Sequence, residues 1–298
     1  MSLELKKAYR YCKAITKKHA KSFYFASKFL PKQKRKSIYV LYAFCRHVDD
    51  EIDKAKIENE SHAIEEVKKW QESLEKLYND GFPSGSNDRI NLVLLAWSDV
   101  LRSYKIPLSL PIELIKGVLM DTHVKRYETF DTLYVYCYRV ASTVGLMSCE
   151  IFGYQNPSAL KFAEAMGIAM QITNILRDVG EDAKMQRIYI PLEDLKNFGV
   201  SEEQIIEGKK DDNFIRLMKF QIDRARKFYK EAEQGIPILE PDTRFTVFLA
   251  SRIYAKILDE IEKQDYDVFN RRAHTTTAQK LLSLPSLWLE FENFKRLD

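Results

Sequence analysis

The chain has 298 residues, 45% of them hydrophobic, so it can bury a sizeable core in one large domain or two small ones. Its formal net charge of +4 is small against 47 basic and 43 acidic residues, which gives no indication of nucleic-acid binding, although a slightly basic surface suits an anionic substrate or a membrane. Only 10 glycines and 9 prolines interrupt the sequence, which favours long helices over many short strands.

Apolar periodicity predicts a series of helices along the chain. The expected ranges are 3–19, 32–55, 61–78, the segment INLVLLAWSDVLRSY, 112–127, 131–153, 157–183, 212–234 and 241–266. The clearest loop is NDGFPSGSND at 79–88, and residues 184–200 are expected to form a loop followed by a short turn. No alternating pattern is long enough to build a sheet. The sequence therefore predicts an all-α fold in a single domain that spans residues 1–298.

A stripe of polar residues follows one face of the helix expected over 32–55. It consists of Tyr42, Arg46, Asp49 and Asp53, which step by four, three and four. At about 3.6 residues per turn, these steps place all the side chains on one side of the helix. Two carboxylates therefore lie one turn apart, with a guanidinium and a phenol upstream on the same face.

The helix expected over 157–183 carries a second stripe with nearly the same rhythm, made of Gln171, Asn174, Asp178 and Asp182. The intervening residues are mostly apolar, which predicts a buried helix with one polar seam. Two like charges one turn apart cost roughly 0.2–0.5 kcal/mol even on an exposed helix, and burial without compensation costs more. Mg²⁺ can compensate them, because it takes one or two carboxylates together with water and substrate phosphates.

Two facing acidic seams would hold divalent ions around a diphosphate, with Arg46 and Arg177 forking onto the phosphate oxygens. The alternative for each seam alone is a solvated helix face. The apolar neighbours of both seams favour the metal-binding interpretation.

Four segments resemble one protein family. GIAMQITNILRDVGEDAKMQRIYIP is similar to the second signature of squalene and phytoene synthases, and YCYRVASTVGLMSCEI resembles their first signature. HAKSFYFASKFLP and MDTHVKRYETFDTL resemble the bacterial carotenoid branch of the family. The resemblance implies an isoprenoid-synthase-type helical fold with a central cavity.

The resemblance also implies a reaction. One prenyl diphosphate ionises and alkylates the double bond of a second, proton loss closes a cyclopropyl diphosphate, and this intermediate ionises and rearranges to a linear hydrocarbon. The expected reaction joins two geranylgeranyl diphosphates to phytoene. The alternatives are a dehydrosqualene, presqualene diphosphate or squalene synthase that uses farnesyl diphosphate, an enzyme that cyclises or elongates a prenyl diphosphate, and a non-enzymatic metal-binding helical scaffold.

By the same resemblance, catalytic side chains are expected at Asp49, Asp53, Asp178, Asp182, Tyr136 and Arg177. Metal ligands are expected at Asp49, Asp53, Asn174, Asp178 and Asp182. Substrate contacts are expected at Lys21, Ser22, Phe23, Tyr42, Arg46, Val140, Ala141, Gly145, Gln171, Asn174, Tyr189, Tyr254 and Arg271. The small residues Ala141 and Gly145 would either widen a cavity for the prenyl chain or let two helices pack closely. No residue stands out as the proton acceptor.

The expected cofactor is Mg²⁺, with Mn²⁺ as an alternative, and no NADPH is expected because the chain lacks a GxGxxG motif and resembles phytoene synthases most. Four cysteines without metal spacing and the absence of a signal peptide predict a cytoplasmic protein. Its apolar runs are too short for the roughly 20 residues that span a bilayer. The C-terminal LLSLPSLWLEFENF would either dock on the domain or touch a membrane peripherally. Substrate chain length and oligomeric state do not follow from the sequence.

Overall fold

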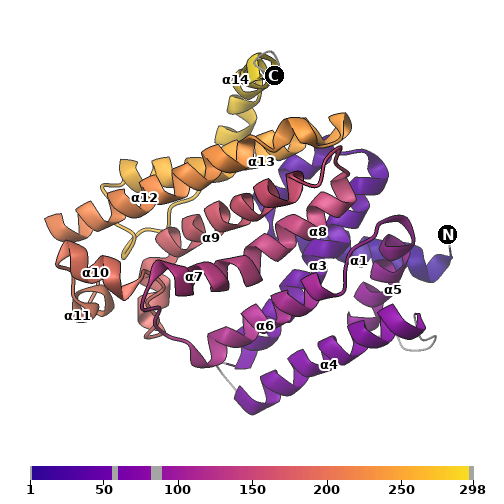
Figure 1. The fold of residues 1–298 in the computed structure, drawn as a ribbon, viewed down its shortest axis with the longest axis horizontal. Coiled ribbons are helices and arrows are strands. Elements are labelled where there is room, and N and C mark those ends of the chain that lie inside the picture. The colour runs from indigo at the N-terminus through magenta and orange to yellow at the C-terminus, as the bar shows by residue number, and fades with distance from the viewer. Residues whose placement is uncertain (1, 56–59, 82–88, 295–298) are drawn as a thin grey trace.

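The computed structural model describes residues 2–55, 60–81 and 89–294, and this part of the chain consists of helices and the connections between them, with no strand (Figure 1). Its helices are α1 (Leu3–His19), α2 (Lys21–Ala26), α3 (Lys32–Ala55), α4 (Glu60–Asp80), α5 (Arg89–Ser103), α6 (Ser109–His123), α7 (Phe130–Cys137), α8 (Thr143–Phe152), α9 (Ala159–Lys184), α10 (Leu192–Phe198), α11 (Glu202–Ile206), α12 (Asp212–Glu233), α13 (Pro241–Lys263) and α14 (Thr277–Phe294). The all-α fold class expected from the sequence is confirmed.

Helix α9 lies in the middle of the molecule, where it packs on α8, α12 and α13 (Figure 1). Its apolar residues fill the core on several sides; they are Ile168, Ala169, Ile172, Ile175, Leu176 and Val179. The helix ends where Gln186 takes a left-handed φ of 57°. Because α9 is buried on most of its circumference, its polar stripe faces the interior of the protein.

Two glycines bring α9 close to the preceding segment. A Cβ on Gly167 would lie 2.4 Å from the backbone of Ser142, and one on Gly145 would lie 2.6 Å from the carbonyl oxygen of Ala163. Neither position has room for a side chain. Gly145 therefore serves close helix packing, and it also lines the central cavity.

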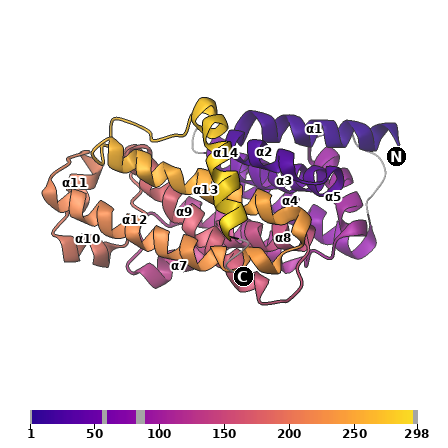
Figure 2. The ribbon, with the colours of Figure 1, turned by 90° about the horizontal axis from the view of Figure 1, so that it is seen from above.

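Two large hydrophobic cores flank the central cavity. One gathers around α9 and α12, and the other around α3, α4 and α5, where Trp70 and Trp97 pack against Phe44. Figure 2 shows the N-terminal helices at one end of the molecule and α10 to α12 at the other. In the described part of the chain, no helix combines the length and the apolar character needed to cross a membrane.

Three differences from the sequence predictions fall between α6 and α10. Helix α6 ends at His123 rather than near residue 127, because the chain turns extended at Val124 and Arg126 forms a parallel bridge with Ile188. The segment expected as one helix over 131–153 is interrupted by a π-helical turn, Tyr138–Ser142.

The third difference concerns residues 184–200, which contain the helix α10 rather than only a loop and a turn. Pro191 precedes its first residue, Glu193 and Asp194 lie in its first turn, and Gly199 ends it with φ of 67°. These are ordinary start and stop signals for a short helix. The helix escaped prediction because its seven residues are too few for a clear period.

Candidate active site

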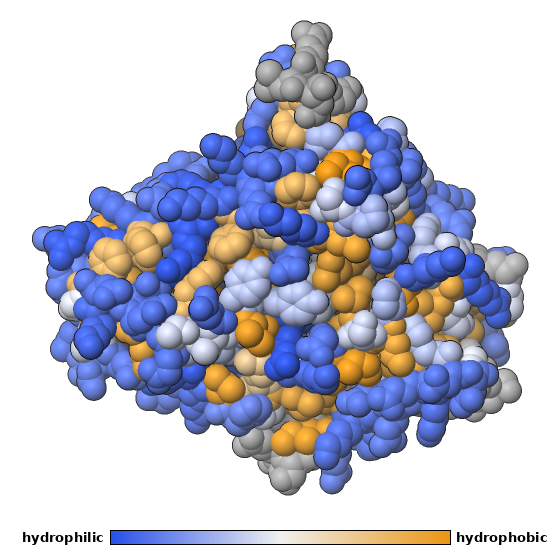
Figure 3. Space-filling model, in the orientation of Figure 1, coloured by the Kyte–Doolittle hydropathy of each residue, from blue (hydrophilic) through white to orange (hydrophobic). Residues whose placement is uncertain are grey.

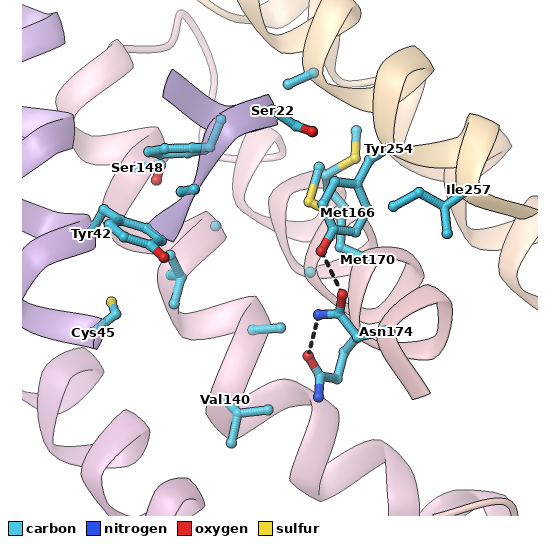
Figure 4. Close-up of a pocket in the computed structure, with 18 of the residues that line it drawn as sticks. Ser22, Tyr42, Cys45, Val140, Ser148, Met166, Met170, Asn174, Tyr254 and Ile257 are labelled. Atoms are coloured by element: carbon cyan, nitrogen blue, oxygen red, sulfur yellow. Dashed lines mark hydrogen bonds between the residues drawn. The ribbon is translucent and has the colours of Figure 1, made fainter. Parts of the chain in front are cut away.

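A cavity of about 1070 Å³ opens between α2, α3, α6, α8, α9 and α13. Its wall changes character along α9, from Met166 and Met170 to Asn174 and then Asp178, at one helical turn per step. Figure 4 shows Met166, Met170 and Asn174 following one another along this helix, with Tyr254 facing them from α13. The cavity therefore has an apolar wall and a polar region on the same helix.

Most of the residues predicted for the site line this one cavity. They are Lys21, Ser22, Phe23, Tyr42, Arg46, Asp49, Tyr136, Val140, Ala141, Gly145, Gln171, Asn174, Arg177, Asp178, Asp182, Tyr189 and Tyr254. The two acidic stripes, on α3 and α9, therefore face the same space. Asp53 belongs to α3, but its side chain lies outside the described residues.

Asp178 is held by two arginines. Arg177 donates from Nε and a terminal nitrogen to the two carboxylate oxygens at 2.8 and 2.5 Å, and Arg272 does the same at 2.8 and 3.2 Å. Burial alone would raise the pKa of this carboxyl, yet the hydrogen bonds and positive charges of both arginines outweigh it and hold the pKa below its ordinary value. Asp178 is therefore an ionised carboxylate.

Arg272, and not the predicted Arg271, reaches the cavity. Arg271 is exposed, its backbone oxygen accepts a hydrogen bond from Gln264 at 3.2 Å, and its side chain is not part of the cavity wall. Arg272 also pairs with Glu181 at 3.2 Å. The prediction for Arg271 is therefore corrected to its neighbour. The segment between α13 and α14 that carries both residues has no helical period to decide which side chain points inward.

Arg46 organises the stripe on α3. It pairs with Asp49 at 3.3 Å and with Asp50, which the sequence reasoning did not single out. Its Nε atom is buried and has no hydrogen-bond partner within the described part of the protein. A buried donor without an acceptor is costly, and an anionic oxygen in the cavity would satisfy it.

Three side chains link α9 with α13 on the cavity wall. Tyr254 donates to the amide oxygen of Asn174 at 2.5 Å, and the amide nitrogen of Asn174 donates to Gln171 at 3.1 Å (Figure 4). These bonds fix the orientation of the Asn174 amide, so that its oxygen lies beside a phenol. The predicted stripe on α9 thus belongs to a network with α13.

A cluster that the sequence reasoning missed centres on Asp121 of α6. Tyr136 and Tyr189 donate to its two carboxylate oxygens at 3.1 and 2.7 Å, and Arg187 donates to its backbone oxygen at 2.5 Å. All of these residues line the cavity. The available signal was a lone carboxylate at the end of an apolar helix, within a segment already noted for its family resemblance.

Further positive charge lines the cavity near α2. Lys280, at the start of α14, is only 6% exposed, and burial first and the nearby Lys21 second lower its pKa. Lys21, Arg272 and His274 belong to the same wall. The cavity therefore combines carboxylates on two helices with lysine and arginine side chains, an arrangement suited to an anion and the metal ions that accompany it.

Comparison with known proteins gives a consistent result. Residues 16–279 match the model of the squalene/phytoene synthase family. A phytoene synthase from Arthrospira platensis is 42% identical over 291 residues, covering 93% of this chain and 91% of that protein, and a 15-cis-phytoene synthase from Synechocystis is 40% identical over 297 residues, covering 96% and 86%. A dehydrosqualene synthase in complex with ligand has a TM-score of 0.88 at 32% identity, covering 97% of this chain and 98% of the other. The chain therefore belongs to the squalene/phytoene synthase family.

Proposed function

We propose that this protein condenses two molecules of geranylgeranyl diphosphate head to head, through a cyclopropyl diphosphate, to phytoene. The observation that carries the proposal is the 42% identity to a phytoene synthase across 93% of the chain. The cavity supports it, because one large space with a polar region and an apolar wall suits two prenyl diphosphates. We treat the chain as one domain, since the cavity takes its walls from both halves of the sequence.

The donor chemistry of the cavity fits Mg²⁺, with Mn²⁺ as an alternative. Asp49, Asp178, Asp182 and Asn174 offer oxygen ligands, which hard divalent cations prefer. Among the described residues, no three His, Cys, Asp or Glu side chains lie close enough together to hold one ion, and Mg²⁺ ordinarily takes one or two carboxylates and completes its shell with water and phosphate. Bound there, with Asp53 as a further candidate ligand, the metal would supply Lewis-acid stabilisation of the diphosphate leaving group.

The protein's own side chains bind the diphosphate and shield the carbocation. Lys21, Arg46 and Arg272 bind and orient the diphosphate, because guanidinium and ammonium groups on the cavity wall neutralise its charge. Met166 and Met170 line the apolar region, where exclusion of water protects the carbocation from being quenched. Phenol rings such as Tyr42 present their faces to the developing cation. No nicotinamide reductant is needed for this product.

Product analysis tests the proposal. The purified protein is incubated with geranylgeranyl or farnesyl diphosphate, with Mg²⁺ or EDTA, and with or without NADPH. We expect phytoene from the geranylgeranyl substrate, dependent on Mg²⁺ and independent of NADPH. A hydrocarbon that forms only with NADPH, or only from farnesyl diphosphate, would contradict the assignment.

We also propose that the protein is cytoplasmic and contacts membranes peripherally through α14. Figures 1 and 3 show this helix projecting from the body of the molecule with apolar side chains on its surface. Leu282 is 81% exposed and Leu289 is 65% exposed, whereas Leu287 and Phe291 are buried against α13. The segment that leads into α14 lines the cavity, so membrane contact here would bring the cavity near a supply of prenyl lipids.

Liposome flotation tests the membrane contact. The protein is mixed with vesicles of phosphatidylcholine and phosphatidylglycerol, and the variant carrying Leu282→Ser and Leu289→Ser is compared with wild type. Burial of one leucine contributes about 1.5–3 kcal/mol, so losing both should reduce the bound fraction at least tenfold. Equal flotation of variant and wild type would contradict this part of the proposal.

A further inference from the structure

The basic residues of this chain are unevenly distributed along the sequence. Residues 1–36 contain 12 of the 47 lysines and arginines but only one acid, Glu4, so this segment alone has a formal charge of +11. The rest of the chain contains the other 35 basic and 42 acidic residues, which gives it a formal charge of −7. The small net charge of the whole protein conceals this separation. A strongly basic segment in an otherwise acidic chain indicates an anionic partner for that segment.

Helix α1 gathers part of this charge on one face. Lys6, Arg10, Lys13 and Lys17 step by four, three and four, which places their side chains along one side of the helix, and all four are exposed. The residues that α1 buries against α3 and α5 lie on a different side. We call these four side chains the basic stripe; it extends about 16 Å along the helix axis.

The charges of the basic stripe are not neutralised within the fold. Among the residues that the structure describes, no carboxylate pairs with any of its four members, whereas Lys34 on the following α3 pairs with Asp242 at 2.6 Å. Like charges three and four positions apart destabilise a helix, so the stripe costs stability and gains none back from the protein. Its counter-charges are therefore expected outside the protein.

The basic stripe ends beside the opening of the cavity. Lys18 and Lys21, which follow it, are both exposed and line the cavity, so the cavity reaches solvent at this point. Burial first and the charge of Lys21 second lower the pKa of Lys280, which places α14 on the other side of the same opening. Figure 2 shows α14 crossing beside α2 at the C-terminal end of α1.

Exposed aromatic rings connect α14 with the segment that follows α2. Phe29, in the short 3₁₀ turn Ser27–Phe29, packs on Phe245 with ring centroids 5.2 Å apart, and Phe245 packs on Trp288 of α14 at 4.7 Å. Phe29 and Trp288 are exposed, and so is Lys28 beside Phe29. Aromatic and leucine side chains next to lysines are typical of surfaces that lie at the headgroup level of a bilayer. They favour a membrane over RNA, which offers leucine side chains no apolar phase.

We propose that the basic stripe of α1 is the electrostatic part of a membrane-docking surface and that its partner is a bilayer with anionic headgroups. The inference rests on the proposed function, because it deepens the membrane contact assigned there to α14. The stripe attracts the anionic surface, and the exposed leucines of α14 enter the interface. Docked in this way, the opening of the cavity faces the lipid that holds a prenyl substrate and that takes up an apolar hydrocarbon product.

Vesicle binding by a stripe variant tests the inference. The variant carries Lys6→Gln, Arg10→Gln, Lys13→Gln and Lys17→Gln, none of which touches the cavity wall. Each basic side chain near an anionic surface contributes about fivefold in affinity. The partition coefficient on vesicles that contain phosphatidylglycerol should therefore fall at least about 50-fold, with no change on pure phosphatidylcholine. Wild-type binding to the anionic vesicles should also weaken between about 0.1 M and 1 M salt, as the Debye length shrinks from about 10 to 3 Å.

The matched control removes the same charge at another place. Lys196→Gln, Arg216→Gln, Lys219→Gln and Lys227→Gln replace three lysines and one arginine that are exposed on α10 and α12, at the other end of the molecule (Figure 2). This variant should bind anionic vesicles within about threefold of wild type, because charges far from the bilayer are screened. Equal losses in the two variants would overturn the inference, since they would show a response to net charge alone. Undiminished binding by the stripe variant would overturn it as well.

A polyanion identifies the alternative partner. Tighter binding of wild type to polyadenylate RNA than to anionic vesicles, at equal phosphate concentration, would overturn the membrane as the partner of the stripe. Circular dichroism and turnover of substrate in detergent micelles check the fold of the stripe variant, and both should match wild type. If four substitutions unfold the protein, the pair Lys13→Gln and Lys17→Gln decides in their place, with an expected loss of at least about tenfold in affinity.

The outcomes separate this inference from the proposals on which it rests. A wrong product assignment shows in the hydrocarbons that wild type makes in detergent, where no bilayer is present. A wrong role for α14 shows in the variant of Leu282 and Leu289, and a wrong role for the basic stripe shows only in the stripe variant.

Discussion

Replacing Asp178 by asparagine probes the charge arrangement of the cavity most directly. The side chain is 19% exposed, and each of its oxygens receives one hydrogen bond from Arg177 and one from Arg272. An amide of the same shape has no charge and only one acceptor oxygen. It therefore cannot accept the four hydrogen bonds that the two guanidinium groups donate to the carboxylate.

We expect Asp178→Asn to lower the free energy of unfolding. Hydrogen bonds to charged groups contribute about 1.5–3 kcal/mol, and because Arg272 is 53% exposed its share is screened toward the 0–1 kcal/mol of a surface pair, which leaves a loss of about 1–2 kcal/mol. For a chain of this length that is a fall in Tm of about 2–3 °C. The two stripes alone suggest the opposite, a gain from relieved repulsion, but the structure shows that arginines surround this carboxylate.

The pH dependence has a definite sign. The folded-state pKa of Asp178 is lowered, so its contribution to stability is present above the unfolded-state pKa of about 3.9 and is lost as the pH falls through the lower folded value. The difference in Tm between wild type and variant should be full at pH 7 and vanish in strong acid. Glu181→Gln is the control, since this 54% exposed carboxylate shares Arg272 and should change stability by less than about 0.5 kcal/mol.

Asp178→Asn should also lose most of its turnover. Loss of one group from a preorganised electrostatic site costs about 2.7–4 kcal/mol, or a hundred- to a thousandfold in kcat. The assay is hydrocarbon formation from geranylgeranyl diphosphate, run beside differential scanning fluorimetry. An unchanged or raised Tm at pH 7 would refute the stabilising role of the arginines, and turnover within tenfold of wild type would refute the metal-binding role of Asp178.

Three other outcomes can be checked. Arg272→Ala should weaken substrate binding at least tenfold in KM, whereas Arg271→Ala should not, because only the former side chain lines the cavity; steady-state kinetics decide, and equal effects would contradict the assignment. Gly167→Ala should lower stability by about 1–3 kcal/mol, since its Cβ would lie 2.4 Å from Ser142, and urea unfolding measures this; an unchanged midpoint would show that the helices shift freely. Asp53→Asn should abolish most turnover with the fold retained, as circular dichroism and product assays can show, and near-normal activity would remove Asp53 from the proposed metal site.

Helical periodicity was sufficient for the parts of the fold that are long and amphipathic. The first helix, α3 and α9 match their predicted ranges closely, because each keeps a helical period of apolar and polar residues over several turns. Contacts with distant segments explain why the predicted end of α6 was wrong. Helix α6 stops where Arg126 finds partners in Glu202 and the carbonyl of Gln186, contacts that bring together residues 60 to 76 positions apart. A sequence pattern in one window does not contain such contacts.

The same distinction applies to the site. The stripes on α3 and α9 were predictable because all their members lie on one helix and share its period. Asp121 was not, since its partners Tyr136 and Tyr189 lie on other segments, 15 and 68 residues away. The prediction named Arg271 instead of its neighbour Arg272 for a related reason. Outside a helix, neighbouring side chains have no fixed alternation that would decide which of them faces the cavity.

The proposed reaction needs two different environments, and helix α9 provides them on successive turns. Met170 and Asn174 are one turn apart on α9, about 6 Å along the axis, and the cavity wall changes there from thioether to amide and then to carboxylate. Ionisation of a diphosphate needs charge concentrated on the leaving group, while the carbocation needs walls without nucleophiles or water. Changes on the Met166 side should therefore alter the accepted chain length with little effect on ionisation. Changes from Asn174 toward Asp182 should slow ionisation for every chain length, because they act on the diphosphate that all prenyl substrates share.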